Sequence, residues 1–526
     1  MVDYKKYFPL TNGFITMDIR ELEKITTDLK NGSDAGISKQ HNSGKLTARE
    51  RISRLVDSES FSELGMFVKH RAVSFGMADK DIPLDGVITG YARIANRPVY
   101  IAAQDFTVSG GTLGEMHAQK IAECQQRAMD AGVPIIFVND SGGARIQEGV
   151  DALSGFGRIF HNAIKASGVI PQISIIAGPC AGGAVYAPAL TDFIFVTDKV
   201  SKMFITGPNV IKEVTGEDVD FETLGGADTQ SRISGVAHFR FHTEDECYEG
   251  VKKLLSYLPD NNLDDVRAVE YNDDDNRFSD ALDSIIPSVA SKPYDIKEVI
   301  RQISDDGDFF EYSEFFAPNI VTCFARIGGT SVGIVANQPM VYAGSLDCDA
   351  SDKASRFVRT CDAFNIPLIT LVDVPGFLPG VKEEHKGIIR HGAKLLYSYS
   401  EAVVPKITII LRKAYGGAYI AMCSKSLGAD FVYAWPGAEI AVMGAEGAVG
   451  ILYAKELKND SDGTYKAQKI SEYKKEFMSP LVAAQRGIVD DIIMPSVTRK
   501  RIISALQLLK SKKAYKIQKK HGNMPL

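Results

Sequence analysis

The sequence of 526 residues lacks several features that would place it in a common class of protein. Its seven cysteines stand singly, with no CxxC pair and no cluster with histidine, so we expect no disulfide framework and no metal site. No run of about 18 uninterrupted apolar residues occurs, so no membrane span is expected. Early acidic residues and the lack of an unbroken apolar core argue against a signal or transit peptide. Free thiols suit a reducing compartment, and we therefore expect a cytoplasmic protein.

Several short catalytic motifs are also absent. The sequence has no GxxxxGK[ST], GxSxG or HExxH pattern, and its glycine pairs do not fit GxGxxG. Nothing therefore indicates a Walker-type nucleotide loop, an α/β-hydrolase nucleophile, a zinc protease or a dinucleotide fold. A net charge of −6 gives no support to nucleic-acid binding. The hydrophobic content of 45% is that of a globular protein, and the length allows two or three domains.

What the sequence has instead is a long internal repeat. Residues 170–187 (IPQISIIAGPCAGGAVYA) align with 404–421 (VPKITIILRKAYGGAYIA) at an offset of 234, and residues 91–94 and 133–136 align with later segments at 233. A nearly constant offset predicts a duplicated domain rather than a solenoid. Strand-like segments alternate with helical ones, which predicts an α/β protein with mainly parallel sheets. The Asp- and Asn-rich segment 258–278 is the expected linker, so we predict domains over 1–270 and 285–526.

Each half carries two glycine-containing loops where we expect chemistry. Segments 140–144 and 373–377 each follow one predicted strand, and segments 182–184 and 416–418 each follow the next. Backbone N–H groups at a helix start carry partial positive charge, and glycine lets a ligand oxygen approach them. Two such loops could direct two N–H donors at one oxygen, as an oxyanion hole does. A Gly-Gly pair is also common as a tight packing turn, but repetition at matched positions favours two ligand sites.

Other residues at matched positions leave their roles open. Lys120 and Lys353 stand at an offset of 233, and each could contact phosphate or be a solvated helix residue. Asp140 and Asp373 come directly after apolar strands, where capping or bracing of the loop is the expected role. His117 lies near the first loops and is expected to be structural.

Long motifs of the sequence resemble one family. DFTVSGGTLGEMHAQKI, NDSGGARIQEGVDALSG, GPCAGGAVYAPALTDF, RKAYGGAYIAM, AWPGAEIAVMGAEGA and KKHGNMPL are similar to carboxyltransferase (β) subunits of biotin-dependent acyl-CoA carboxylases, with propionyl-CoA carboxylase β as the nearest description. Methylmalonyl-CoA decarboxylase α subunits and transcarboxylase central subunits share these motifs. The resemblance covers the chain from about residue 35 onward. It implies tandem duplicated crotonase-like (ClpP/crotonase) domains with spiral ββα units, in a homohexamer whose active sites lie between the first domain of one subunit and the second domain of its dimer partner.

The resemblance also implies roles for individual residues. The first domain would hold the acyl-CoA, with Gly182 and Gly183 stabilising the thioester enolate oxygen. The second would hold carboxybiotin, with Gly417 and Ala418 stabilising the ureido oxygen. The other implied site residues are Gly142, Gly143, Ala144, Arg145 and Ala184 for acyl-CoA, and Gly376, Phe377, Gly416 and Tyr419 for biotin.

Position 420 is the implied determinant of substrate choice. Relatives specific for propionyl-CoA commonly carry Asp three residues after the second glycine of the AYGGAY motif, and this chain has Ile420 there. Ile420 therefore weakens a strict assignment to propionyl-CoA and favours shorter or more varied acyl groups.

The activity implied by the resemblance is transfer of a carboxyl group from carboxybiotin to the α-carbon of a short-chain acyl-CoA such as propionyl-CoA or acetyl-CoA, within a ligase complex. No Met-Lys-Met biotinylation site and no ATP-grasp-sized domain is found, so biotin would be carried covalently by a separate chain. Biotin carboxylase and biotin carboxyl carrier subunits would be the partners. The alternative is the α subunit of a methylmalonyl-CoA decarboxylase, or a transcarboxylase, running the transfer from acyl-CoA to biotin. A CoA hydratase or isomerase would need acidic residues poised at the loops, and a non-catalytic scaffold would not need intact glycine loops.

Overall fold

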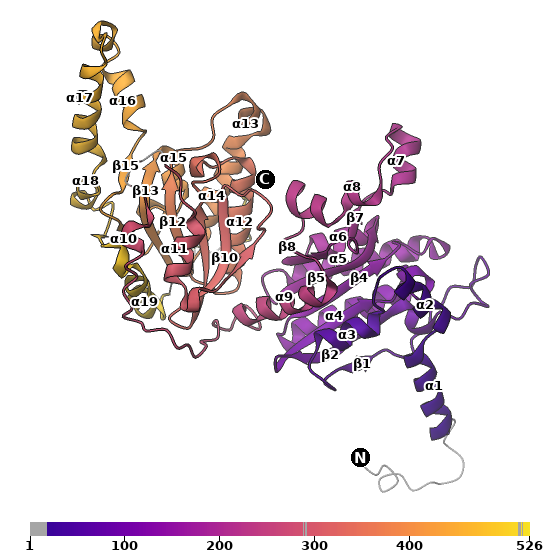
Figure 1. Cartoon of the computed structure of the whole chain (residues 1–526). Coiled ribbons are helices and arrows are strands. Elements are labelled where there is room, and N and C mark those ends of the chain that lie inside the picture. Colours follow the sequence, from indigo (N-terminus) through magenta and orange to yellow (C-terminus); the bar gives the residue numbers. More distant parts are fainter. Residues whose placement is uncertain (1–17, 288, 290–291, 514–516, 518) are drawn as a thin grey trace.

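The computed structural model describes residues 18–287, 289, 292–513, 517 and 519–526, so the expectation about an N-terminal leader falls largely outside the described residues, in 1–17. The chain forms two α/β halves, each built around one sheet, that lie side by side (Figure 1). Within the described ranges, no helix is both long enough and apolar enough to cross a lipid bilayer.

The first half contains one sheet with the strand order β1-β2-β3-β4-β5-β6-β8, and β7 pairs with β5. Its strands are β1 (Ser62–Leu64), β2 (Val87–Ile94), β3 (Arg97–Gln104), β4 (Ile135–Ser141), β5 (Gln172–Ala181), β6 (Phe193–Thr197), β7 (Lys202–Phe204) and β8 (Phe239–Phe241). Its helices are α1 (Ile19–Asn31), α2 (Asp34–Asn42), α3 (Ala48–Leu55), α4 (Glu115–Ala131), α5 (Val150–Ala166), α6 (Gly183–Ala189), α7 (Pro208–Thr215), α8 (Phe221–Gly225) and α9 (Glu244–Tyr257).

The second half repeats this sheet with the order β9-β10-β11-β12-β13-β14-β16, and β15 pairs with β13. Its strands are β9 (Phe309–Tyr312), β10 (Ile320–Ile327), β11 (Thr330–Asn337), β12 (Leu368–Val374), β13 (Lys406–Tyr415), β14 (Phe431–Ala434), β15 (Glu439–Ala441) and β16 (Asp491–Ile492). Its helices are α10 (Leu282–Ile285), α11 (Ile296–Ile303), α12 (Cys348–Ala363), α13 (Val381–Lys386), α14 (Ile388–Glu401), α15 (Gly416–Ala421), α16 (Ala445–Leu452), α17 (Thr464–Tyr473), α18 (Pro480–Gln485) and α19 (Thr498–Leu509).

Strand pairing follows the same plan in both halves. The first three strands of each sheet pair antiparallel, through the hairpins β2–β3 and β10–β11, and the remaining strands pair parallel. The structure therefore confirms the duplicated α/β architecture with parallel-rich sheets. Residues 258–281, all described, contain no helix or strand and connect the two halves.

The duplication extends further towards the N-terminus than the constant offset of 233 reaches. Asp57 accepts hydrogen bonds from the N–H groups of Ala95 and Asn96 in the β2–β3 turn, both at 2.8 Å. Asp305 accepts from Gly328 and Gly329 in the β10–β11 turn, at 2.9 and 2.7 Å. The offset of this aspartate is 248 because the connection from β1 to β2 spans 65–86, whereas that from β9 to β10 spans only 313–319.

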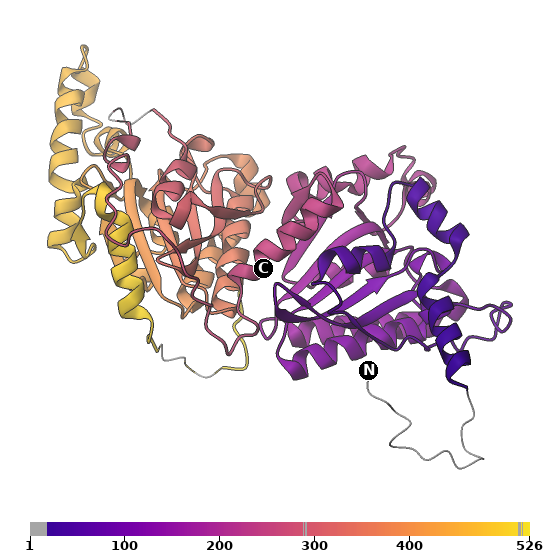
Figure 2. The same ribbon diagram turned by 60° about the horizontal axis from the view of Figure 1, so that its bottom comes forward.

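Burial on both faces explains the continuous apolar runs of the central strands. Along β4, Ile136 and Val138 face the core that includes α3 and α9, while Ile135 and Phe137 face the core under α4 and α5. Alternate side chains of a strand point to opposite faces, so a sheet covered by helices on both sides needs apolar residues at every position. Figure 2 shows helices on both sides of the first sheet.

A helix cap and a cluster of aromatic rings hold these elements in place. Thr47 caps α3 in a capping box with Glu50. The halves are joined by aromatic packing, in which the ring of Phe193 lies 6.4 Å from that of Tyr312 and 6.2 Å from that of Phe324. Aromatic pairs at this spacing add to the burial of their area, so the two halves share one continuous core.

Candidate active site

The richest sequence match, at residues 170–187 and 404–421, forms the same turn in each half. β5 ends at Ala181, Gly182 follows it with a φ of +60°, and α6 begins at Gly183. β13 leads into Gly416, whose φ is also +60°, at the start of α15. A positive φ costs little only for glycine, so both turns require this residue at their first position.

The N–H groups of the first turn divide into bonded and unbonded ones. Gly182 donates its N–H to the carbonyl oxygens of Phe204 and Ile205, at 3.2 and 3.1 Å. Gly183 and Ala184 start α6, where the first N–H groups of a helix have no partner within it. The available donors of the first turn are therefore those of Gly183 and Ala184, and the N–H of Gly182 holds the turn against the strand end at β7.

The second turn offers the matched donors, Gly417 and Ala418, in the first turn of α15. A Cβ on Gly417 would lie 4.0 Å from the ring of Phe377, whereas a Cβ on Gly183 would meet the ring of Phe156 at 3.2 Å. Side chains at these positions would occupy the space over the N–H groups, so glycine keeps both turns open to a ligand oxygen.

The loop after β4 is braced internally. Gly143 has a φ of +100°, and a Cβ there would lie 3.0 Å from the carbonyl oxygen of Ala181, so the two loops of this half are in contact. Gly142 donates its N–H to Gly110 O at 3.0 Å, Gly143 to Ser141 Oγ at 3.1 Å, and Arg145 to the carbonyl of Leu113. The loop predicted to follow the CoA thus has a conformation held by its own neighbours, with three of its N–H groups engaged.

The side chain of Arg145 turns inwards from this loop. It pairs with Asp85 and with Glu148, the latter at 2.7 Å, and donates to Thr112 O at 2.8 Å, with only 2% of the side chain exposed. Burial raises the pKa of Asp85, and the guanidinium of Arg145 opposes this rise. Arg145 therefore braces the loop, and its charge is not offered to a phosphate.

The predicted biotin residues are distributed around the second turn. Gly376 follows β12 with a φ of +154°, and Leu346 pairs with Phe377 as Leu113 pairs with Ala144 in the first half. The ring of Phe377 lies against α14, where a Cβ on Gly392 would be 2.9 Å from it.

Tyr419 and Ile420 lie on different faces of α15. The Tyr419 ring is buried in the shared core, and burial raises its pKa to about 12. Ile420 is 44% exposed, and its matched residue in α6, Tyr186, is 48% exposed. Ile420 can therefore contact a ligand or another protein surface, whereas the ring of Tyr419 packs in the core on which the turn rests.

The matched lysines are both buried, with only 4% of each residue exposed. Lys120 donates to Leu84 O at 2.9 Å and to Val87 O, and Lys353 donates at 2.8 Å to Ile320 O, which matches Val87. Both readings of these lysines are therefore wrong, because each ammonium group is buried against backbone carbonyls. Burial lowers the pKa of Lys120 to about 8 and that of Lys353 to about 7.

His117 is structural, as expected. It is fully buried, and its Nδ1 lies 2.8 Å from the carbonyl oxygen of Asp85. Burial lowers its pKa to about 3, so the ring stays neutral.

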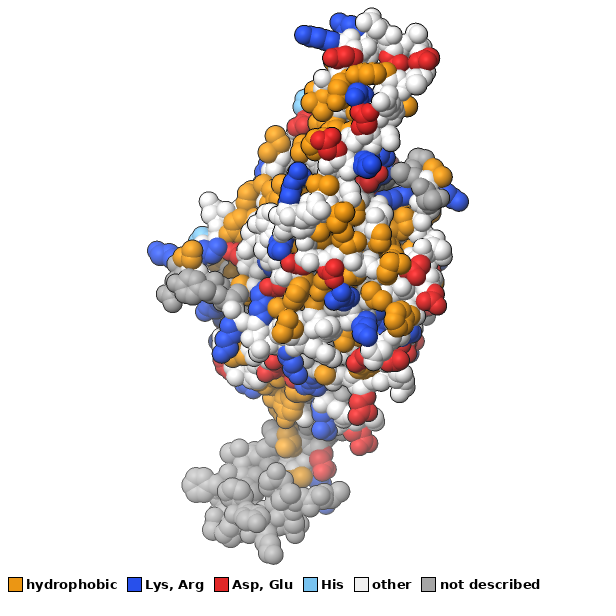
Figure 3. Space-filling view, turned by 90° about the vertical axis from the view of Figure 1, so that its left-hand side faces the viewer, with side chains coloured by type: hydrophobic (Ala, Val, Ile, Leu, Met, Phe, Trp, Pro, Cys, Tyr) orange, Lys and Arg blue, Asp and Glu red, His pale blue; other side chains and the backbone are white. Residues whose placement is uncertain are grey.

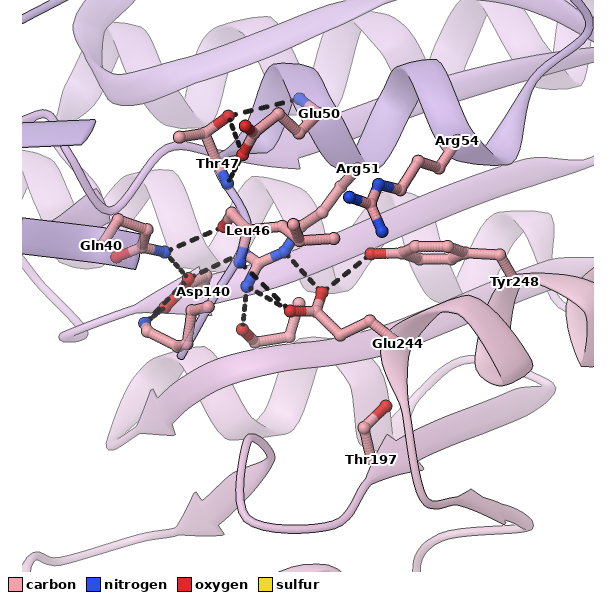
Figure 4. A network of polar contacts seen from close by, with 12 residues as sticks. Gln40, Leu46, Thr47, Glu50, Arg51, Arg54, Asp140, Thr197, Glu244 and Tyr248 are labelled. Atoms are coloured by element: carbon pink, nitrogen blue, oxygen red, sulfur yellow. Dashed lines mark hydrogen bonds and ion pairs between the residues drawn. The ribbon is translucent and has the colours of Figure 1, made fainter. Parts of the chain in front are cut away.

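Asp140 is the centre of a buried network that the sequence did not reveal (Figure 4). Its carboxylate accepts from Gln40 Nε2 at 2.9 Å, Lys45 Nζ at 2.9 Å and Arg51 Nη1 at 2.8 Å. Arg51 also donates through Nε to Glu244 at 2.8 Å. Asp140 and Arg51 are both fully buried, so their charges are paired where water cannot reach them. The only sequence signal was the match between Asp140 and Asp373.

The glycine turns are only partly covered by the rest of the chain. Gly182 and Gly183 are half-buried, Gly417 is exposed, and the side chains of Ala184 and Ala418 are buried beneath them. Exposed apolar side chains stand beside the turns. These are Tyr186 and Ile205 in the first half, and Ile420 and Val442 in the second.

Comparison with known proteins identifies the family. A family model described as the carboxyl transferase domain matches residues 39–524. The chain belongs to the carboxyl transferase family. It is 56% identical over 504 residues to the methylmalonyl-CoA decarboxylase subunit alpha of Veillonella parvula, covering 96% of this chain and 98% of the relative. It is 56% identical over 505 residues to the propionyl-CoA carboxylase carboxyltransferase subunit of Haloferax mediterranei, covering 96% and 98%.

A solved carboxyl transferase structure has the same fold. It is a crystal structure of transcarboxylase 12S, described as a hexamer assembly with hydrolysed methylmalonyl-coenzyme A bound. The TM-score is 0.94 at 54% identity, over 97% of this chain and 98% of that one. The chain is thus a carboxyltransferase of the biotin-dependent family, with two crotonase-like halves.

Proposed function

We propose that the chain is the carboxyltransferase subunit of an acyl-CoA carboxylase. It moves the carboxyl group from carboxybiotin, carried by a separate protein, to the α-carbon of propionyl-CoA or acetyl-CoA. The observation that carries this proposal is the duplicated glycine turn, with two unbonded N–H groups in each half. The enzyme works in the cytoplasm with separate biotin carboxylase and biotin carboxyl carrier subunits.

The first turn suits an oxygen that becomes negatively charged during the reaction. Removing the α-proton of an acyl-CoA places negative charge on the thioester oxygen. The N–H groups of Gly183 and Ala184 can stabilise that charge, because Gly183 has no side chain to keep the oxygen away. One oxyanion donor contributes about 3 kcal/mol to lowering a barrier of this kind. The braced loop at 142–145 lies beside this turn and would hold the CoA.

The second turn suits the ureido oxygen of biotin. The N–H groups of Gly417 and Ala418 begin a helix, and Gly417 is exposed, so a carbonyl oxygen fits there without displacing protein. Carboxybiotin, when bound, supplies the carboxyl group and then the ring nitrogen that takes the α-proton. The chain therefore needs no basic side chain at the reacting carbon, which agrees with the absence of paired carboxylates or a His/Asp pair beside the turns among the described residues.

A complete site would require two copies of the chain. The two turns belong to different halves, and each has exposed apolar neighbours, such as Ile205 and Val442. An arm formed by α16 to α18 extends from the second half and displays hydrophobic side chains (Figure 3), including Ile451 and Leu481 at 67% and 56% exposure. Exposed apolar faces of this kind mark interfaces. We expect a dimer that pairs the first turn of one copy with the second turn of its partner, within a homohexamer.

A second function runs the transfer in the other direction. The 56% identity to a methylmalonyl-CoA decarboxylase α subunit equals the identity to a propionyl-CoA carboxylase subunit, so the same turns suit transfer from an acyl-CoA to biotin. The direction depends on partner proteins, because the turns stabilise the same anions either way.

The deciding experiment mixes the purified chain with a carrier protein bearing ¹⁴C-carboxybiotin and, in separate reactions, acetyl-, propionyl- or butyryl-CoA. Label should appear in the acyl product, and its ranking over the three acyl groups gives the substrate. A parallel reaction supplies labelled methylmalonyl-CoA and unloaded biotinyl carrier. Transfer in neither direction would contradict the proposal.

Two glycine variants sharpen the transfer experiment, one placed in the first turn and one used as its control. Gly183→Val should abolish most transfer, since its side chain would enter the turn against Phe156. Gly157→Ala, on the exposed face of α5 with nothing near its Cβ, should transfer as well as the wild type. Turnover by Gly183→Val at the wild-type rate would instead indicate a non-catalytic scaffold.

A further inference from the structure

The two halves share an irregularity just before their glycine turns. Pairing between β4 and β5 passes from Asn139↔Ile176 to Ser141↔Cys180, so β5 holds two more residues than β4 over this stretch. Pairing between β12 and β13 shows the same step, from Val372↔Ile410 to Val374↔Ala414. These bulges set the direction in which each strand reaches its glycine pair.

A fully buried carboxylate stands opposite each bulge, but its hydrogen-bond donors differ. In the second half, Asp373 accepts from Arg412 Nε at 2.9 Å and from the Lys413 N–H at 3.0 Å, and both residues lie on the bulge itself. The matched residues of the first half are Gly178 and Pro179. Gly178 has no side chain to match that of Arg412, and Pro179 has no N–H to match that of Lys413, so both of these donors are missing.

The N-terminal segment supplies the missing donors in the first half. Gln40, Lys45 and Arg51 reach Asp140 from the region of α2 and α3, as Figure 4 shows. Arg51 also donates through Nη2 to Ala177 O at 2.6 Å. One guanidinium therefore ties β4 to β5 at the first residue of the bulge.

Each half lacks the guanidinium donor that the other half uses. The residue of α11 that matches Arg51, at the offset of 248, is Val299, which is buried in an apolar core. A Cβ on Gly178 would lie 1.9 Å from Oδ1 of Asp140, so the first half has no room for a side chain like that of Arg412. Each half thus pairs one buried carboxylate with one guanidinium, delivered by a helix in the first and by the strand in the second.

We propose that Arg51 and Asp140 are positioning residues for the acyl-CoA turn at 182–184, and that Arg412 and Asp373 position the biotin turn at 416–418. This inference rests on the proposed function. In the first half, Arg51 and Lys45 balance Asp140 and Glu244, so the cluster adds no net charge to the site. Its effect is on the shape of the bulge, and through it on where the N–H groups of Gly183 and Ala184 point.

The test compares how tightly a variant binds an anion that mimics the enolate. Two CoA thioethers are used, one with a nitroalkane that ionises to a nitronate and one without the nitro group. The wild type should prefer the nitronate. Asp140→Asn keeps the shape of the side chain but weakens its pairing with Arg51, and it should lower this preference at least tenfold with kcat falling on the order of 10²-fold. The affinity for the neutral thioether should stay the same.

Two controls separate positioning from a general loss of structure. Asp373→Asn should lower transfer activity while leaving the nitronate preference intact, because it acts on the other turn. Arg54→Gln removes an exposed ion pair with Asp245 one turn further along α3, and it should change neither activity nor preference. If Asp140→Asn does not fold, Lys45→Gln, which removes one donor to the same carboxylate, should show a smaller drop of the same kind.

The outcomes distinguish this inference from the proposed function. A wild type that prefers the nitronate, together with Asp140→Asn or Lys45→Gln variants that keep the full preference, would overturn the positioning role alone. A wild type without any preference for the nitronate would overturn the proposed use of the first turn. A drop in affinity for both thioethers equally would show a structural role and overturn the inference.

Discussion

The two halves end their bulged strands in the same glycine turn, yet they hold that turn from different parts of the chain. Asp373 is bonded by its neighbours on β13, whereas Asp140 is bonded from α2 and α3, about 90 to 100 residues earlier in the sequence. The carboxylate of the second half is therefore held by the adjacent strand of its own sheet, and that of the first depends on docking of the N-terminal segment. Duplicated domains can thus keep one geometry while exchanging the residues that support it.

The largest expected effect comes from removing the two guanidinium groups in turn. Arg51→Met leaves Asp140 and Glu244 buried without their shared partner, and we expect a loss of about 3–5 kcal/mol in the free energy of unfolding. Arg412→Met should cost less, because Arg412 pairs with one carboxylate, Asp373, whereas Arg51 pairs with both Asp140 and Glu244. Urea unfolding followed by circular dichroism measures both. An equal loss of unfolding free energy in the two variants would contradict this contrast between the halves.

The glycine turns should respond alike if both stabilise anions. Gly183→Val and Gly417→Val are each expected to lower kcat on the order of 10²- to 10³-fold, since each side chain would cover two N–H donors. Carboxyl transfer from loaded carrier to acyl-CoA measures this, with Gly157→Ala as the control. A severe loss in only one of the two variants would show that only one turn stabilises a developing charge.

Two matched aspartates have different partners in the two halves, and the one in the first half predicts a dependence of stability on pH. Asp192 accepts from the Gln172 N–H, and burial raises its pKa from 3.8 to about 6. Asp430 accepts from the matched Lys406 N–H but also pairs with Lys512 at 2.7 Å.

Because the folded state of Asp192 holds its proton more tightly, its contribution to stability is complete below pH 3.8 and is lost as the pH rises through 6. Through Asp192, the free energy of unfolding of the wild type should fall by about 2–3 kcal/mol between pH 4 and 7, and Asp192→Asn should remove this fall. Unfolding at several pH values measures it, and an unchanged slope would contradict the raised pKa.

The smallest expected effect concerns substrate choice at the outer face of α15. Ile420→Asp should shift the ranking of acyl groups towards propionyl-CoA by several fold, within the range of about 1–3 kcal/mol that separates substrates differing by one methylene. Leu508→Asp, an equivalent change at 70% exposure on α19, is the control. Competition between acetyl- and propionyl-CoA measures the ranking, and an unchanged order would reject this role for Ile420.

Some of the site could be predicted from the sequence because it depends on local chemistry. The positive φ of Gly182 and Gly416 requires glycine, and Thr47 caps α3 through bonds to residues within one turn. The roles of Lys120 and Lys353 were missed, because a helix position does not show whether a lysine is buried. Arg51 was missed for a different reason, since its partner Asp140 lies 89 residues away and its matched residue is a valine.

By itself, the sequence determined the duplication, the alternation of strands and helices, and the places where glycine opens the backbone to a ligand. Each of these depends on residues close together along the chain or on identity between two segments. The tertiary structure decided which N–H groups remain unbonded, which carboxylates are braced and from where, and which apolar side chains stand exposed beside the two turns. These depend on contacts between distant segments, where burial makes a charge pair obligatory without dictating which part of the chain must supply it.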